Sequence, residues 1–148
     1  DSYRSALLRI NHKFEVFPQA CPLFVPLVEN AFIDPGDQVT NLVAQRYLSG
    51  LRGAGVDTLI LGCTHYPIIS AIISKAMGDQ VTLIDSGRET AVYAARLLKD
   101  QQLLASGGQE GRNAFYVSDS VEDFSRLASI FLRQDVAAEV TQVDIWRY

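Results

Sequence analysis

Short apolar runs alternate along the chain with longer segments in which apolar residues recur at helical spacing. The runs are rich in β-branched, aromatic and aliphatic residues, which predicts strands at 14–17, 56–61, 81–84, 114–117 and 140–145. The run at 58–61 shows little alternation, as expected of a parallel strand covered by helices on both faces. This order predicts an α/β fold, with a mostly parallel sheet and helices on both of its faces.

Helices are predicted between the strands by apolar stripes and by start and stop signals. After the turn at 35–36, one stripe predicts a helix that buries Val39, Leu42, Val43, Leu48 and Leu51. Pro67 suits the first position of the next helix, where its missing N–H costs nothing. That helix ends at Gly78 and is expected to bury Ile68, Ile69, Ile72, Ile73, Ala76 and Met77.

Two later helices are predicted from their capping residues. Ser86 and Glu89 form a capping-box pattern before a helix at 90–99. Asp119 or Ser120 is expected to cap another helix, and its predicted buried face carries Phe124, Leu127, Ala128 and Phe131.

Composition narrows the classes of function. The chain has 148 residues, 48% of them hydrophobic and 20% charged, which is typical of a soluble globular protein. A net charge of −4 provides no basic surface for nucleic acid or anionic membrane, and no apolar run approaches the roughly 20 residues of a membrane span. Two cysteines and two histidines make a four-ligand zinc site improbable, so we expect no metal and free thiols. The first residues lack an initiator Met, and we expect the chain to be cut from a longer protein.

The strongest chemical signal is Cys63, in the run LGCTHYP at 61–67. Residues 62–66 are expected to form the turn at the carboxyl end of a buried strand, where open α/β sheets bind ligands. The N–H groups of Thr64 and His65 would lie near a helix start, which suits a carboxylate. The same field and the nearby imidazole favour the thiolate form of Cys63.

Other interpretations of these residues stay open at this point. A lone cysteine in an apolar segment is commonly a packing residue, and Cys21 is interpreted as structural. His65 taken alone is as well explained by a structural role. A cysteine hydrolase or transferase would use Cys63 as nucleophile and His65 as base. The two residues are only two positions apart on a tight turn, which is an awkward spacing for a hydrogen bond between nucleophile and base. No third residue that would orient the base is evident.

Three blocks together resemble the glutamate racemases, within the aspartate/glutamate racemase superfamily. The run at 61–67 is similar to the family's C-terminal signature. The segments at 19–29 (QACPLFVPLVE) and 83–91 (LIDSGRETA) resemble those upstream and downstream of it. The resemblance extends roughly over residues 1–100, and from Asn113 onward it is one of pattern.

The resemblance implies an isomerase that interconverts L- and D-glutamate without a cofactor or metal. Its D-glutamate would supply peptidoglycan, and so cell wall biogenesis and cell shape, in the bacterial cytoplasm. In the family, two cysteines face opposite sides of the substrate α-carbon, and one removes the proton while the other donates one. The implied partner is glutamate, with no nucleic acid and no membrane, and a homodimer is one expected arrangement.

The resemblance also implies roles for four residues. Cys63 matches the second of the two catalytic cysteines, and Thr64 matches a substrate-binding position. His65 matches a histidine that assists proton transfer or binds the substrate. Glu29 matches an acidic residue that assists the cysteine, although a solvated surface glutamate is the alternative.

The sequence also departs from the family pattern. The first cysteine, in a Cys-Asn-Thr type motif, and an Asp-Ser segment that binds the amino group are absent, and Cys21 lies in a different block. By the family pattern, residues 1–86 form most of the second racemase domain and residues 87–148 return to complete the first. The chain alone is therefore expected to be inactive. An aspartate or other amino-acid racemase is the nearest alternative, although those enzymes typically carry Glu where His65 stands. A non-catalytic binding module is another.

Overall fold

The computed structural model describes residues 2–105, 107 and 111–147. The chain divides into two compact units, Asp1–Glu89 and Thr90–Tyr148, which are considered separately below. Assigning these units to two racemase domains stays a prediction. Within the described part of the chain, no helix combines the length and apolarity needed to cross a membrane.

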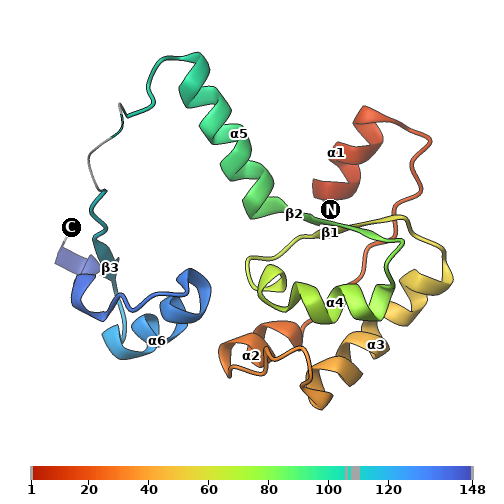
Figure 1. The fold of residues 1–148 in the computed structure, drawn as a ribbon, viewed down its shortest axis with the longest axis horizontal. Coiled ribbons are helices and arrows are strands. Elements are labelled where there is room, and N and C mark those ends of the chain that lie inside the picture. The colour runs from red at the N-terminus through yellow and green to blue at the C-terminus, as the bar shows by residue number, and fades with distance from the viewer. Residues whose placement is uncertain (1, 106, 108–110, 148) are drawn as a thin grey trace. The chain divides into compact units, whose positions relative to one another are not determined.

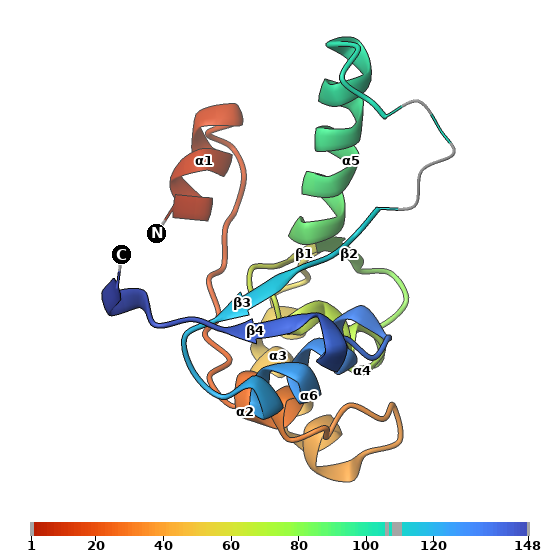
Figure 2. The same ribbon diagram turned by 90° about the vertical axis from the view of Figure 1, so that its left-hand side faces the viewer.

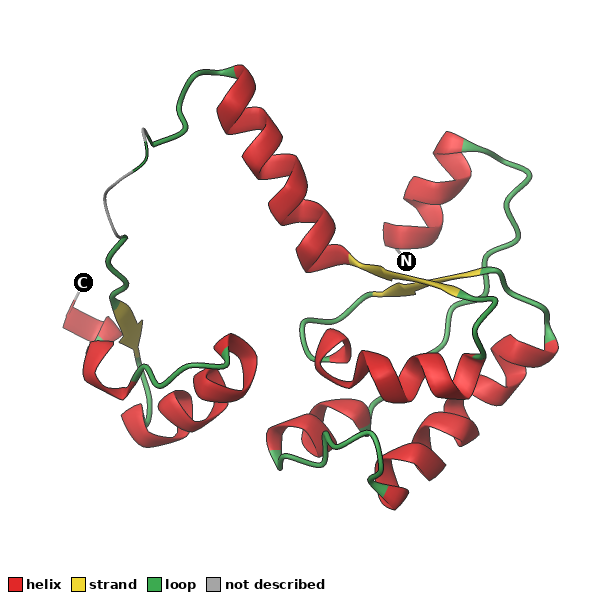
Figure 3. Ribbon diagram, viewed as in Figure 1, coloured by secondary structure: helices red, strands yellow, loops and turns green. Residues whose placement is uncertain are grey.

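The first unit contains a two-stranded parallel sheet with helices on each side of it. Strands β1 (Thr58–Leu61) and β2 (Thr82–Asp85) pair in parallel, with Leu61 opposite Asp85. Helix α1 (Ser2–Ile10) lies on one side of the strands, and α3 (Gln38–Gly53) and α4 (Ser70–Met77) lie on the other (Figures 1 and 2). The predicted α/β class with parallel pairing is confirmed, although the strands are short and helices predominate (Figure 3).

Helix α3 buries a different stripe from the predicted one. Its buried residues are Thr40, Ala44, Leu48 and Leu51. Val39 and Leu42 are exposed, so this part of the prediction is wrong. The reason lies in the first turn, where the Thr40 hydroxyl donates to the Phe32 carbonyl at 2.8 Å and its N–H donates to Asp37. These bonds turn Thr40 inward, and the helical repeat then places Leu42 outward.

The helix that follows the Cys63 turn largely matches its prediction. It begins as a 3₁₀-helix, η1 (Tyr66–Ile69), with Pro67 in its first turn, and continues as α4. Gly78 ends it with a φ of 95°, a conformation that favours glycine. The side chains it buries are Ile69, Ile72, Ile73 and Met77.

Helix α5 (Ser86–Asp100) begins earlier than the predicted start at residue 90. Asp85 caps it by accepting from the N–H groups of Gly87 and Arg88 at 2.9 and 3.1 Å. The predicted capping box is therefore wrong, and the Ser86 hydroxyl instead donates to the Leu61 carbonyl at 3.3 Å. This bond ties the end of β1 to the start of α5.

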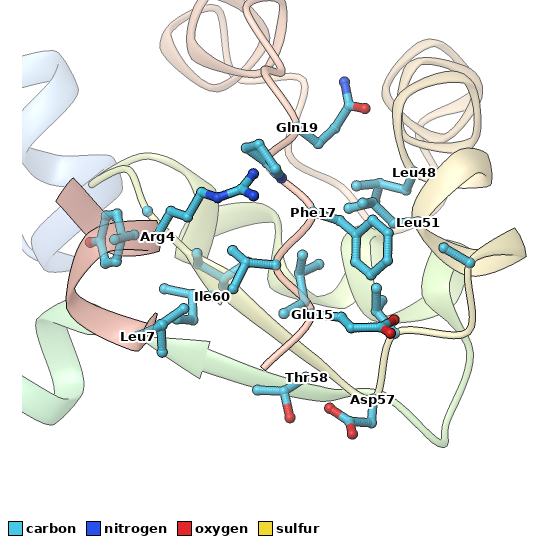
Figure 4. Close-up of a pocket in the computed structure, with 18 of the residues that line it drawn as sticks. Arg4, Leu7, Glu15, Phe17, Gln19, Leu48, Leu51, Asp57, Thr58 and Ile60 are labelled. Atoms are coloured by element: carbon cyan, nitrogen blue, oxygen red, sulfur yellow. The ribbon is translucent and has the colours of Figure 1, made fainter. Parts of the chain in front are cut away.

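The predicted strand at 14–17 is wrong, because this segment forms no strand in the structure. A strand forms through hydrogen bonds to a neighbouring strand, and among the described residues the segment 14–17 pairs with no strand. The segment and β1 both line a cavity of about 730 Å³, which also receives side chains of α1 (Figure 4). Phe14 and Phe17 remain half-exposed beside it.

The second unit is built around another parallel pair. Strands β3 (Phe115–Val117) and β4 (Val140–Gln142) pair in parallel, and α6 (Val121–Leu132) lies between them in the sequence. Two short 3₁₀-helices, η2 (Ala137–Glu139) and η3 (Ile145–Arg147), precede and follow β4. Of the two predicted caps for α6, the structure uses Ser120, which accepts from the Asp123 N–H at 3.1 Å. The predicted strand at 140–145 is shorter than expected.

We expect two leucines of α3 to differ sharply in their contribution to stability. Leu48 is 3% exposed and Leu42 is 66% exposed. Leu48→Ala should lower the free energy of unfolding by about 2–5 kcal/mol, because it removes buried atoms and leaves a cavity. Leu42→Ala, the matched control, should change it by no more than about 0.5 kcal/mol. Urea unfolding followed by circular dichroism measures both, and similar losses would contradict the burial of this helix face.

A cysteine, a histidine and a glutamate at the end of a parallel strand

Cys63 lies in the turn that joins β1 to η1, at the carboxyl end of the strand, as predicted. The turn is closed by main-chain bonds from Gly62 N–H to the Ile60 carbonyl and from Ile68 N–H to the His65 carbonyl. A Cβ on Gly62 would lie 3.2 Å from the ring of Tyr3. Tyr3 of α1 therefore packs closely against this glycine.

The structure brings together all four residues singled out from the sequence. Glu29 ends helix α2 (Phe24–Glu29), and its Oε1 lies 3.1 Å from Nε2 of His65. The other ring nitrogen, Nδ1, lies 3.9 Å from the Cys63 thiol and 3.2 Å from the Thr64 hydroxyl. The result is a line of contacts from carboxylate to imidazole to thiol.

The glutamate contact sets the protonation pattern of the neutral imidazole. A carboxylate only accepts hydrogen bonds, so the contact requires a proton on Nε2 of His65. Nδ1 is then the acceptor, available to the Thr64 hydroxyl and to the Cys63 thiol. In this tautomer Nδ1 of His65 faces the thiol as a hydrogen-bond acceptor.

This geometry corrects one expectation drawn from sequence spacing. Cys63 and His65 are only two residues apart, yet the turn brings the thiol and Nδ1 to 3.9 Å. Glu29 is the orienting third residue that the local sequence did not reveal, because it lies on another helix 36 positions away. Taken alone, the three side chains suit both acid–base and nucleophilic chemistry.

Tyr66 and Cys21 form a partly buried contact beside this group. The Tyr66 hydroxyl donates to the Cys21 carbonyl at 3.2 Å, and its ring packs edge-on against Phe24, with ring centres 5.4 Å apart. Burial raises the pKa of the Tyr66 phenol, which keeps its proton on the oxygen. Burial also raises the pKa of the Cys21 thiol to about 11. Cys21 is therefore a poor source of thiolate, in agreement with its structural interpretation.

Two hollows lie near the turn, and Cys63 lines neither. The cavity of about 730 Å³ receives Gly62 and Tyr66, and a shallower hollow of about 380 Å³ is bordered by Pro67, Asp85 and Arg88. Within the described residues, no three His, Cys, Asp or Glu side chains converge as metal ligands would. The thiol of Cys63 thus stands at a partly exposed turn.

We expect the two thiols to differ in reactivity in the folded chain. At pH 7.5, iodoacetamide should alkylate Cys63 at least about tenfold faster than Cys21, because the thiolate is the reactive form and Cys21 is 5% exposed with a raised pKa. Mass spectrometry of peptides over time measures both rates. The chain unfolded in urea is the control, in which the rates should converge. Equal rates in the folded chain would contradict the burial of Cys21.

The sequence is similar to that of glutamate racemases. It is 46% identical over 131 residues to the glutamate racemase of Geobacter metallireducens, and the aligned region covers 88% of this chain and 48% of that protein. It is 42% identical over 132 residues to the glutamate racemase of Chlorobaculum tepidum, covering 89% and 48%. The chain thus spans about half the length of these relatives. No protein-family model matches it.

The fold is similar to solved glutamate racemases. A structure of an isoform from Bacillus anthracis superimposes with a TM-score of 0.85 at 32% identity, covering 97% of this chain and 52% of that one. The Francisella tularensis enzyme in complex with D-glutamate gives the same score and identity, covering 99% and 53%. In sequence and in fold, the chain is related to the glutamate racemases and corresponds to about half of their length.

Proposed function

We propose that the protein to which this chain belongs is a glutamate racemase, and that Cys63 is one of its two acid–base thiols. The observation that carries the proposal is the contact series from Glu29 through His65 to Cys63 at the carboxyl end of β1. Its support is the similarity to named glutamate racemases at up to 46% identity. Because the chain spans half of their length, the activity is proposed for the whole protein.

The chemistry requires an acid and a base on opposite faces of one carbon. A thiolate on one face removes the α-proton of glutamate, and a thiol on the other face donates a proton to the carbanion. Each turnover leaves the donor as thiolate and the acceptor as thiol, so the roles reverse for the opposite enantiomer. Cys63 serves one face, and the second thiol comes from outside residues 1–148. No cofactor takes part.

Thr64 and His65 act beside the thiol. We assign Thr64 the role of binding a carboxylate of the substrate, through its hydroxyl and the N–H groups of the turn. His65 exchanges a proton with Cys63 through Nδ1, and Glu29 holds the ring in the tautomer that allows this. The Francisella tularensis relative was solved with D-glutamate, which supports an amino-acid ligand of this size and charge.

The wider role follows from the same proposal. Residues 1–86 form most of the second racemase domain, and residues 87–148 complete the first. The enzyme works in the bacterial cytoplasm and supplies D-glutamate for peptidoglycan, hence for cell wall biogenesis and cell shape. A homodimer is the proposed assembly.

A nucleophilic cysteine is the second candidate, because the Cys63–His65 distance and the orienting Glu29 suit it also. A cysteine hydrolase forms a covalent thioester and exchanges no α-proton. Aspartate as substrate is a further alternative within the superfamily. Both are distinguished by the experiments that follow.

We expect the isolated 148-residue chain not to invert glutamate, because it holds one of two required thiols. The whole protein should invert it, and Cys63→Ala should reduce kcat/KM by at least about 10³-fold, since it removes an essential acid–base group. Cys21→Ala is the matched control and should retain activity. Chiral chromatography with L- and D-glutamate, and in parallel with aspartate, measures the result. Inversion by the isolated chain would contradict the two-thiol mechanism. Faster inversion of aspartate than of glutamate would identify aspartate as the substrate instead.

Solvent exchange tests the face that Cys63 serves. In deuterated water, whole protein carrying Cys63→Ser should exchange the α-proton of one glutamate enantiomer without inverting it, because the opposite thiol still removes its proton. Proton NMR of each enantiomer measures this. If the wild-type protein exchanges the α-proton of neither enantiomer, the nucleophilic alternative is favoured instead.

A further inference from the structure

Helix α2 is held at both ends by two consecutive residues, His65 of the Cys63 turn and Tyr66, which begins η1. At its first residue, Phe24 packs against the ring of Tyr66, whose hydroxyl bonds the carbonyl of Cys21 just before the helix. At its last residue, Glu29 contacts His65. Tyr66 therefore contacts the start of the helix, and His65, the residue before it, contacts the end.

Helix α2 depends on such contacts for its position. It has only six residues, and Leu23 before it makes no side-chain capping bond. A helix this short is not stable by its own hydrogen bonds, so tertiary contacts decide where it lies. From Phe24 to Glu29 the axis rises by about 7.5 Å, at 1.5 Å per residue. Because the two ends of α2 are this close together, we expect a shift at the Tyr66 end to displace the Glu29 carboxylate as well.

We propose that Tyr66 is a positioning residue for the active site, and that its hydroxyl bond to the Cys21 carbonyl holds α2 where Glu29 can orient His65. The inference rests on the proposed function for its effect on turnover, but its structural part stands independently of that function. Tyr66 acts through α2 and does not itself take a proton from the substrate. Glu29 fixes the His65 tautomer, and Tyr66 fixes Glu29.

The chain contains a matched control in Tyr47 of α3. Its ring also packs edge-on against Phe24, with centres 5.5 Å apart, and its hydroxyl accepts from the Leu23 N–H at 3.3 Å. Tyr47→Phe and Tyr66→Phe therefore each remove one hydroxyl that bonds the main chain just before α2, as acceptor in Tyr47 and as donor in Tyr66. Only Tyr66 directly follows His65, so only Tyr66→Phe removes a hydrogen bond between the start of the helix and the segment that carries His65.

The first test reads the His65 ring directly in the 148-residue chain. The chain has two histidines, and the exposed His12 serves as internal reference. Nitrogen-15 NMR of the imidazole rings should show mainly the Nε2–H tautomer at His65 in the wild type. Tyr66→Phe should shift His65 towards a mixture of tautomers, whereas Tyr47→Phe should leave it unchanged. An unchanged His65 spectrum in Tyr66→Phe, with the fold intact by circular dichroism, would overturn the proposal.

The second test measures turnover of glutamate by the whole protein. Tyr66→Phe should lower kcat by about 10- to 100-fold, as a displaced catalytic group does, with little change in KM. Tyr47→Phe should keep the wild-type kcat at a comparable melting temperature. Equal losses in both variants would reduce Tyr66 to a stabilising contact and overturn the proposal. If the wild-type protein does not racemise glutamate but the His65 spectrum responds as expected, the proposed function fails and the positioning role stands.

Discussion

The contact between the Glu29 carboxylate and the His65 ring is the interaction on which the site depends. It joins α2 to the turn that carries Cys63, over a separation of 36 residues. The His65 and Glu29 side chains are 20% and 41% exposed, so water screens their attraction, and pairs of this kind contribute about 0–1 kcal/mol to stability. The consequence is geometric, because the contact decides which imidazole nitrogen faces the thiol.

Parallel pairing determines where that contact can form. The register of β1 and β2 brings Leu61 opposite Asp85, so both strands end at the same edge of the sheet. At that edge Asp85 caps α5, and Ser86 bonds the Leu61 carbonyl. The end of β1 is thereby fixed just before Cys63, and side chains placed by such regular elements hold their geometry better than those on long loops.

Local signals predicted the turn better than they predicted its surroundings. Neighbouring residues alone were enough to predict three features: the strand before Cys63, Pro67 in the first helical turn and Gly78 at the helix end. Glu29 was found only through the family resemblance, because its partner is distant in sequence. The strand at 14–17 failed for the same reason, since strand formation needs a neighbouring strand. The Leu42 error arose because the hydroxyl of the buried Thr40 donates to the Phe32 carbonyl.

The stereochemistry of the proposed reaction explains why one turn cannot complete the site. Inversion needs a donor and an acceptor on opposite faces of the same carbon. A single strand end presents its side chains from one direction, and Cys63 takes that direction here. Cys21 cannot supply the other, because it is buried, and burial raises the pKa of its thiol to about 11. The opposite face of the substrate must therefore be served by a separate element, and the proposed two-domain racemase provides it.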